Sequence, residues 1–218
     1  MINKIVASMA EAMAGIKDGS TVLLAGFAAG TPEQLVYGLM EQGARDLTLV
    51  CNAGGRMDGP IADILATGHV SKLICSFVRA ESIAGQRFAA GKLELEIVPQ
   101  GTLAERIRAG GSGVQAFYTP TGAGTAIAEG RESRVINGRE CLLEYPIRGD
   151  VALIDAWQAD RWGNLTHRES ARNFNPIMAM ASDMAIVQTK HIVELGDLPP
   201  EGIHTAGVFV RRVLHIPG

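Results

Sequence analysis

Apolar residues along the chain alternate between helical spacing and short continuous runs. Helical spacing occurs over residues 4–16, 32–42, 61–66, 81–90 and 102–109. The intervening apolar runs cover residues 21–25, 47–51, 72–78 and 93–98, and they have the length and composition of buried strands. Strands that alternate with helices predict right-handed crossovers and a parallel sheet with helices on both faces.

The pattern changes after about residue 113. Asn137-Gly138 separates two strand-like runs and predicts a hairpin. Residues 151–157 and 164–167 look extended, and a helix at about 176–182 precedes apolar strands at 184–188 and 208–214. We therefore expect one α/β domain over residues 1–218. Its open, mostly parallel sheet is covered by helices on both faces, with antiparallel additions in the C-terminal half.

Composition and charge narrow the class of protein. The 218 residues are 47% hydrophobic and 20% charged, which is typical of a globular chain. A net charge of -3 without a basic stripe argues against nucleic-acid binding. The three cysteines are widely separated, the N-terminus has no secretory pattern, and no apolar stretch approaches the roughly 18–20 residues of a membrane helix. We expect a soluble, cytoplasmic protein without membrane contact.

The loop between the strand at 21–25 and the helix at 32–42 is the first candidate site. It contains Gly26, Phe27, Ala28, Ala29, Gly30 and Thr31. Thr31 suits the N-cap, Pro32 the first helical position and Gln34 the reciprocal cap. Free N–H groups at the helix N-terminus would favour a phosphate or carboxylate, whereas the alternative is a turn whose glycines only permit close packing.

Two amides at strand ends are further candidates. Gln100 follows the strand at 93–98, where open α/β sheets place their ligands, and its NH₂ group can donate to a carbonyl oxygen that becomes negative in acyl transfer. A loop hydrogen bond is the alternative role. Thr102 and Glu105 have capping-box spacing. Asn52 follows the strand at 47–51 and is either a ligand for a substrate oxygen or a turn former.

The sequence lacks the residue patterns of several other kinds of catalytic or nucleotide-binding site. The histidines are scattered without the spacing of metal ligands, so no metal site is expected. The nucleophile elbow Gly-x-Ser-x-Gly, the P-loop and the GxGxxG fingerprint are all absent from the sequence.

Long blocks, in order from about residue 3 to the end, resemble the family I CoA-transferases. They are residues 18–32, 98–111, 117–122, 160–165 and 171–176. Among the members of this family, the chain is similar to the A (alpha) subunit of 3-oxoacid CoA-transferases of the succinyl-CoA:acetoacetate or 3-oxoadipate kind.

The resemblance implies an enzyme that moves CoA from an acyl-CoA such as succinyl-CoA to a 3-oxoacid. In this family a glutamate attacks the thioester, and in two-subunit members it lies in a Ser-Glu-Asn-Gly motif of the B subunit. This sequence has no such motif. The resemblance therefore implies a B-subunit partner, in an A2B2 assembly, with CoA thioester as substrate and no permanently bound cofactor. Gln100 would serve as oxyanion donor, and residues 26–31 with Asn52 would face the substrate or CoA.

The sequence also departs from the family pattern. Ala25 replaces the first glycine of the loop, two residues rather than three separate Phe27 from Gly30, and Cys51 replaces the first of two adjacent asparagines. The alternatives are a non-catalytic module that binds a sugar phosphate or nucleotide on a similar α/β architecture, and a structural partner chain whose site has decayed.

Overall fold

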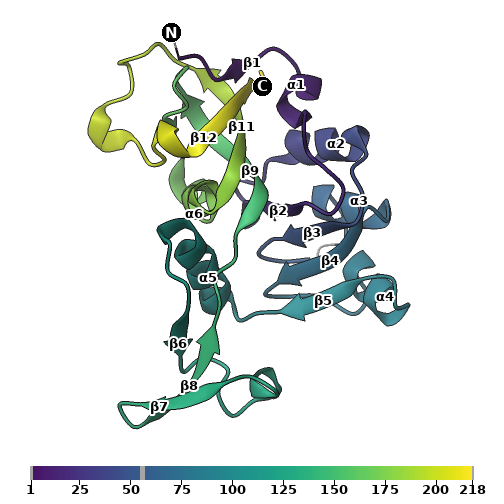
Figure 1. Ribbon diagram of the computed structural model, residues 1–218. Coiled ribbons are helices and arrows are strands. Elements are labelled where there is room, and N and C mark those ends of the chain that lie inside the picture. Colours follow the sequence, from purple (N-terminus) through teal and green to yellow (C-terminus); the bar gives the residue numbers. More distant parts are fainter. Residues whose placement is uncertain (1, 55–56, 218) are drawn as a thin grey trace.

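A computed structural model describes residues 2–54 and 57–217, and Figure 1 labels its elements. The helices are α1 (Met9–Met13), α2 (Glu33–Gln42), α3 (Pro60–Ala66), α4 (Ile83–Ala89), α5 (Gln100–Ser112) and α6 (Asn175–Met180). The strands are β1 (Ile5–Val6), β2 (Thr21–Leu24), β3 (Leu47–Val50), β4 (Val70–Cys75), β5 (Glu94–Ile97), β6 (Phe117–Thr119), β7 (Ser133–Ile136), β8 (Arg139–Glu144), β9 (Gly149–Ala159), β10 (Leu165–Thr166), β11 (Ser182–Ile192) and β12 (Val210–His215).

Within the described residues, the main sheet has nine strands in the order β1-β12-β11-β9-β2-β3-β4-β5, with β10 paired to β9. All of these pairings are parallel except that of β10 with β9. A separate sheet, β6-β8-β7, is antiparallel and projects from the body in Figure 1. This arrangement confirms the predicted fold class.

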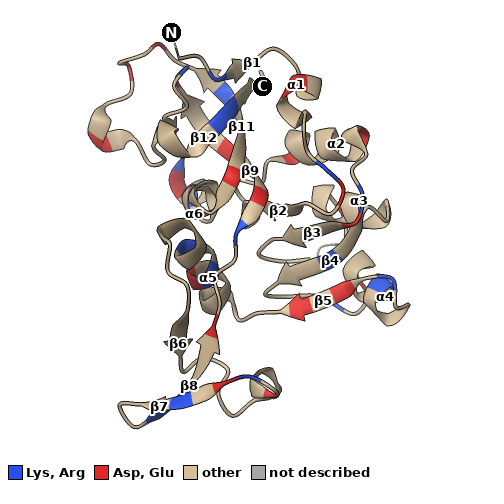
Figure 2. Cartoon of the chain, in the orientation of Figure 1, with Lys and Arg blue, Asp and Glu red and all other residues tan. Residues whose placement is uncertain are grey.

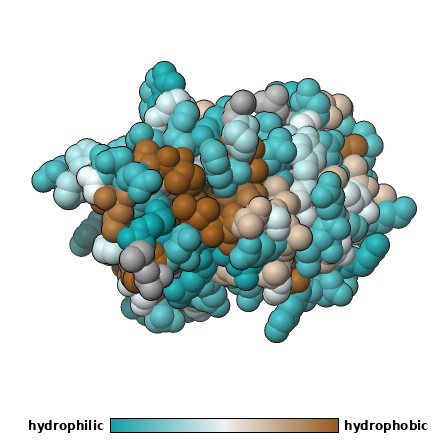
Figure 3. Space-filling view, turned by 90° about the horizontal axis from the view of Figure 1, so that it is seen from above, coloured by the Kyte–Doolittle hydropathy of each residue, from teal (hydrophilic) through white to brown (hydrophobic). Residues whose placement is uncertain are grey.

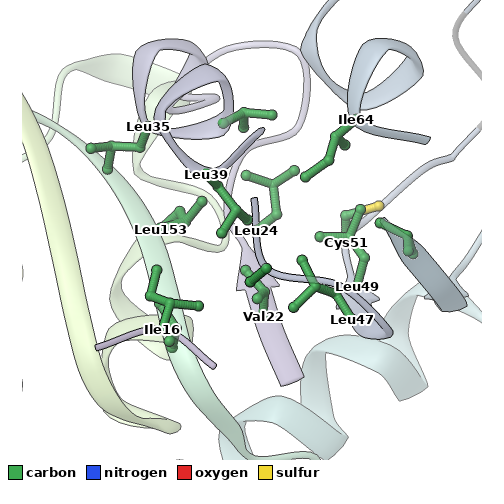
Figure 4. Packing of buried hydrophobic residues seen from close by; sticks show 14 of the residues in the cluster. Ile16, Val22, Leu24, Leu35, Leu39, Leu47, Leu49, Cys51, Ile64 and Leu153 are labelled. Atoms are coloured by element: carbon green, nitrogen blue, oxygen red, sulfur yellow. The ribbon is translucent and has the colours of Figure 1, made fainter. Parts of the chain in front are cut away.

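Alternation along the strands divides the core between the two faces of the sheet. Val22 and Leu24 of β2 belong to one buried cluster, and Leu23 belongs to the other. The first cluster contains side chains of α1, α2, α3 and α4, and Figure 4 shows its packing around Leu39 and Leu153. The second contains side chains of α5 and α6. Helices therefore cover both faces, as the near-continuous apolar strands predict.

The predicted helix over residues 4–16 is wrong at its start. Residues 5–6 form β1, which pairs with β12, and α1 begins only after Ser8. Ser8 accepts a hydrogen bond from the Glu11 N–H, and Glu11 Oε2 accepts one from the Ala7 N–H at 2.8 Å. These two bonds, a variant of the capping box in which Glu11 bonds the residue before the N-cap, start the helix at residue 9 and leave the preceding residues free to join the sheet.

The C-terminal half also supplies the middle of the parallel sheet, beside its antiparallel additions. β9 lies between β2 and β11 and pairs in parallel with both. The antiparallel part of the C-terminal half is confined to β10 and the β6-β8-β7 sheet. In the latter, Asn137 and Gly138 adopt φ values of +52° and +75° between β7 and β8, which confirms the predicted hairpin.

Arg106 of α5 links the projecting sheet to the body through its contact with Glu144. The buried carboxylate of Glu144 in β8 pairs with Arg131 at 2.5 Å and lies 3.7 Å from Arg106 of α5. Arg106 also pairs with Glu96 of β5 at 2.7 Å. Burial raises the pKa of Glu96, but Arg106 and Lys72 outweigh it and hold that pKa below its ordinary value. Figure 2 shows acidic residues along β5 and charges of both signs along the small sheet.

The end of the molecule that carries β1 and β12 exposes apolar side chains. Seen from above in Figure 3, a continuous apolar area is surrounded by polar residues. A hollow beside these strands is lined by Ile2, Lys4, Trp162 and Val208, among others. None of the helices in the described part of the chain has the length and apolar character needed to span a bilayer.

Candidate active site

The carboxyl ends of β2 and β3 frame a pocket of about 370 Å³. Its described lining consists of Gly26, Phe27, Ala28, Thr31, Glu33, Asn52, Ala53, Asp58, Gly59, Pro60 and Ile61. The pocket therefore joins the loop after β2, the turn after β3 and the start of α3. Its size falls within the range of small-molecule sites, and it lies where parallel sheets place their ligands.

The loop after β2 is a tight turn with a defined shape. Phe27 and Ala29 exchange backbone hydrogen bonds of 2.9–3.1 Å, and Ala28 between them has φ +62°. Gly26 has φ +106°, and a Cβ there would lie 2.5 Å from Thr31 Oγ1. Gly30 has φ +72°, and a Cβ there would lie 2.5 Å from the Ala171 carbonyl oxygen. Glycine is required at both positions, because a side chain there would overlap neighbouring atoms and would strain the backbone.

Two asparagines of the block at 171–176 hold this loop from behind. Asn173 Nδ2 donates to the Ala29 carbonyl at 3.0 Å. The fully buried Asn175 donates to the carbonyls of Gly30 and Ala171 and accepts from the Asp155 N–H of β9. The loop is thus anchored to α6 and to the middle of the sheet.

Replacement of Asn175 by alanine is expected to lower the free energy of unfolding by about 3–5 kcal/mol, because two carbonyls and one N–H that are partly buried lose their fully buried partner. Urea unfolding at neutral pH measures the change. The control is Asn3→Ala, which removes one exposed bond to the Ile5 N–H and should change stability by less than about 1 kcal/mol. A loss of similar size in both variants would contradict the anchoring role of Asn175.

The N-terminus of α2 is already occupied by a side chain of β11. Gln188 Oε1 accepts from the N–H groups of Gln34 and Leu35 at 3.1 and 3.2 Å. Gln188 therefore takes up two N–H groups that an anion would bind at this helix end, which favours the alternative of a turn whose glycines permit close packing. Thr31 is not the cap, since the N-cap residue is Pro32 and Thr31 Oγ1 donates to the Ala28 carbonyl.

The two candidate amides lie in contact. Gln100 is the first residue of α5, is exposed to solvent, and donates from Nε2 to Asn52 Oδ1 at 2.9 Å. Asn52 is 4% exposed and lines the pocket. The predicted capping pair is wrong, because α5 begins at Gln100 and places Thr102 inside the helix, where its buried hydroxyl has no partner within the described structure.

The structure therefore brings most of the expected site residues together. Gly26, Phe27, Ala28, Thr31 and Asn52 line the pocket, and Gln100 joins it through Asn52. The two others face away. Gly30 packs against the Ala171 backbone, and Ala29 lines a second hollow on the other side of the loop, with Asp155, Arg168 and Lys190 in its wall.

Sequence reasoning missed Ser76 and Gln188. Ser76 follows β4 and hydrogen-bonds Asn52, and Gln188 caps α2 from another strand. Both contacts join residues far apart in the chain, so no local motif marks them. The predicted strand over residues 72–78 included Ser76, whereas β4 ends at Cys75 and leaves Ser76 at the edge of the sheet where parallel strands end.

The buried groups near the pocket are poor nucleophiles. Burial and the neighbouring Cys75 raise the pKa of the Cys51 thiol well above its ordinary value, so the thiol stays protonated. His167 hydrogen-bonds the Asp155 carbonyl and Thr205, and burial lowers its pKa to about 4. It is therefore a neutral structural link at neutral pH. Within the described residues, no group of three or more His, Cys, Asp or Glu side chains is arranged to hold a metal ion.

Comparison with known proteins identifies the family of this chain. The family model described as Coenzyme A transferase matches residues 6–215. The A subunit of 3-oxoadipate CoA-transferase from Pseudomonas putida is 52% identical, over 100% of this chain and 96% of that protein. The A subunit of the probable succinyl-CoA:3-ketoacid coenzyme A transferase from Bacillus subtilis (strain 168) is 48% identical, over 98% of this chain and 90% of that protein.

Among solved structures, glutaconate coenzyme A-transferase from Acidaminococcus fermentans has a TM-score of 0.87 to this chain at 20% identity. The match covers 98% of this chain and 76% of that chain, and it shows the same fold. Taken with the matches in sequence, it leads to one conclusion: this chain belongs to the family I coenzyme A transferases, among their A subunits.

Proposed function

We propose that this chain is the A subunit of a 3-oxoacid CoA-transferase, and that it moves CoA from succinyl-CoA to a 3-oxoacid such as acetoacetate or 3-oxoadipate. One observation carries the proposal. An exposed carboxamide, Gln100, is held by Asn52 at the edge of a pocket that a rigid glycine loop lines. This is the arrangement that acyl transfer needs for a developing oxyanion.

The chemistry divides between two chains. The nucleophile is a glutamate of the B subunit, which attacks the thioester carbonyl of the donor, and the carbonyl oxygen becomes negative while Gln100 donates to it. The C–S bond breaks, which gives a mixed anhydride and CoA thiolate. The thiolate then attacks the glutamyl carbonyl, releases the donor acid and leaves a glutamyl-CoA thioester. The acceptor acid reverses these steps, so no oxidant, reductant or resident cofactor takes part, and CoA thioester is a substrate.

Apolar side chains around the site support the contact with a partner. Phe27, Met57 and Phe77 follow β2, β3 and β4, and each is more than half exposed. Ile97 at the end of β5 is also exposed. Large apolar residues gathered at one edge are typical of a protein interface. The apolar area at the β1 and β12 end in Figure 3 offers a second contact surface, as an A2B2 assembly requires.

The location that we propose is the cytoplasm. Cys51, Cys75 and Cys141 are all free thiols and all buried, which fits a reducing compartment. The alternative of a sugar-phosphate or nucleotide sensor is not favoured, because Gln188 occupies the N–H groups of α2 that a phosphate would need.

The test is co-expression with a chain that carries Ser-Glu-Asn-Gly, followed by assay of the purified complex with succinyl-CoA. Acetoacetate and 3-oxoadipate are offered as acceptors, with a simple short-chain acid for comparison. We expect CoA transfer to at least one 3-oxoacid. A stable complex that transfers CoA to no acid, or a chain that binds sugar phosphates or nucleotides instead, would contradict the proposal.

A further inference from the structure

We infer that Ser76 is a positioning residue for Gln100 and acts through Asn52. The inference rests on the proposed function, because it concerns the orientation of the amide that donates to the oxyanion. Asn52, Ser76 and Gln100 follow β3, β4 and β5, three neighbouring parallel strands whose carboxyl ends meet at the same edge of the sheet.

Ser76 fixes Asn52 through two groups. The Asn52 carbonyl accepts from the Ser76 N–H at 2.9 Å and from the Ser76 hydroxyl at 2.6 Å. The same hydroxyl lies 3.3 Å from Asn52 Oδ1. A hydroxyl has one proton, so the closer backbone carbonyl is its main acceptor. The N–H and hydroxyl of Ser76 thereby hold the backbone of Asn52 against the end of β4, and the hydroxyl oxygen lies beside the Asn52 side chain.

Asn52 in turn orients Gln100. A glutamine NH₂ group has two N–H donors in one plane, and one of them points at Asn52 Oδ1. That bond fixes the direction of the second N–H, which belongs to an exposed side chain and is available to a ligand oxygen. The Asn52 side chain is buried, so water does not compete for the Oδ1 atom that accepts from Gln100. A donor held before the reaction needs no reorganisation when charge develops.

Ser71 provides a matched control on the same strand pair. Its hydroxyl donates to the Leu47 carbonyl of β3 at 3.4 Å, so it makes the same kind of bond from β4 to β3. It lies at the opposite end of these strands, away from Asn52 and Gln100. Loss of either hydroxyl removes one serine-to-carbonyl contact and leaves the backbone pairing intact.

The experiment measures kcat and KM for succinyl-CoA with the assembled complex. We expect Ser76→Ala to lower kcat about ten-fold with KM within about two-fold, because a misdirected donor weakens the transition state more than the bound substrate. Ser76→Thr keeps a hydroxyl and should stay within about three-fold of the wild-type kcat. Ser71→Ala should match wild type.

The double variant separates positioning from a structural role. If Ser76 acts only through Gln100, then Ser76→Ala in a Gln100→Ala background should cause no further loss of kcat. An equal loss in both backgrounds, or a Ser76→Ala enzyme as fast as wild type, would overturn the inference while leaving the proposed function intact. A wild-type complex without transferase activity would instead overturn the proposed function, and the inference with it.

Discussion

The isolated chain is expected to transfer no CoA between succinyl-CoA and 3-oxoacids, and activity is expected to appear when the B subunit is added. The physical reason is that, in the proposed mechanism, the attacking glutamate comes from the B subunit. The described part of this chain contributes an amide donor and a glycine loop to the site, and the Cys51 thiol is buried and protonated. Titration of a fixed amount of this chain with the partner should raise activity until the two are equimolar, where it reaches a plateau.

The pocket holds two carboxylates of its own, so the identity of the nucleophile needs a direct measurement. Glu33 and Asp58 both line it. Incubation with succinyl-CoA, reduction with borohydride and peptide mapping identify the chain that carries the thioester. We expect the modified residue in the Ser-Glu-Asn-Gly segment of the partner. A reducible thioester on Glu33 or Asp58, formed with this chain alone, would show that the nucleophile is here.

Gln100→Ala is expected to lower turnover of the assembled complex by about 10²–10³, or about 2.7–4 kcal/mol, which is the usual effect of losing one oxyanion donor. Folding should remain intact, because Gln100 is exposed and occupies the first position of α5, where no backbone bond depends on its side chain. Steady-state kinetics with succinyl-CoA measure the loss, and gel filtration of the complex verifies assembly.

A second glutamine near the same helix gives the control. Gln115 follows the C-terminal end of α5, is exposed, and donates to the Gly113 carbonyl. Gln115→Ala should leave turnover within about two-fold of wild type. Gln100→Glu should be at least as slow as Gln100→Ala, because a carboxylate beside Asn52 Oδ1 has no N–H to donate and repels the developing negative charge. Turnover of Gln100→Ala within a few-fold of wild type would remove Gln100 from the mechanism.

Local sequence was sufficient to predict those elements whose structure depends mainly on residues close together in the chain. The alternation of apolar runs and helical spacing between residues 21 and 112 predicts β2 to β5 and the helices between them, because strands inside the sheet bury both faces and each helix buries one. Asn137-Gly138 predicts the β7–β8 turn for a similar reason, since both residues adopt positive φ. Gln100 and Asn52 were found because each lies within three residues of the end of a strand.

Tertiary structure alone decided what depends on distant pairings. The apolar character of Ile5 and Val6 fits a helix or a strand equally well, and only the pairing with β12 makes them a strand. The place of β9 at the middle of the sheet, the capping of α2 by Gln188 and the contacts of Ser76 with Asn52 follow from chain segments that meet after folding. A hydrogen bond between residues far apart in the chain produces no local pattern in the sequence, so it cannot be predicted from spacing. Composition and motifs therefore determined which elements form and which side chains carry chemistry, whereas the meeting of strand ends at one edge determined how those side chains are held.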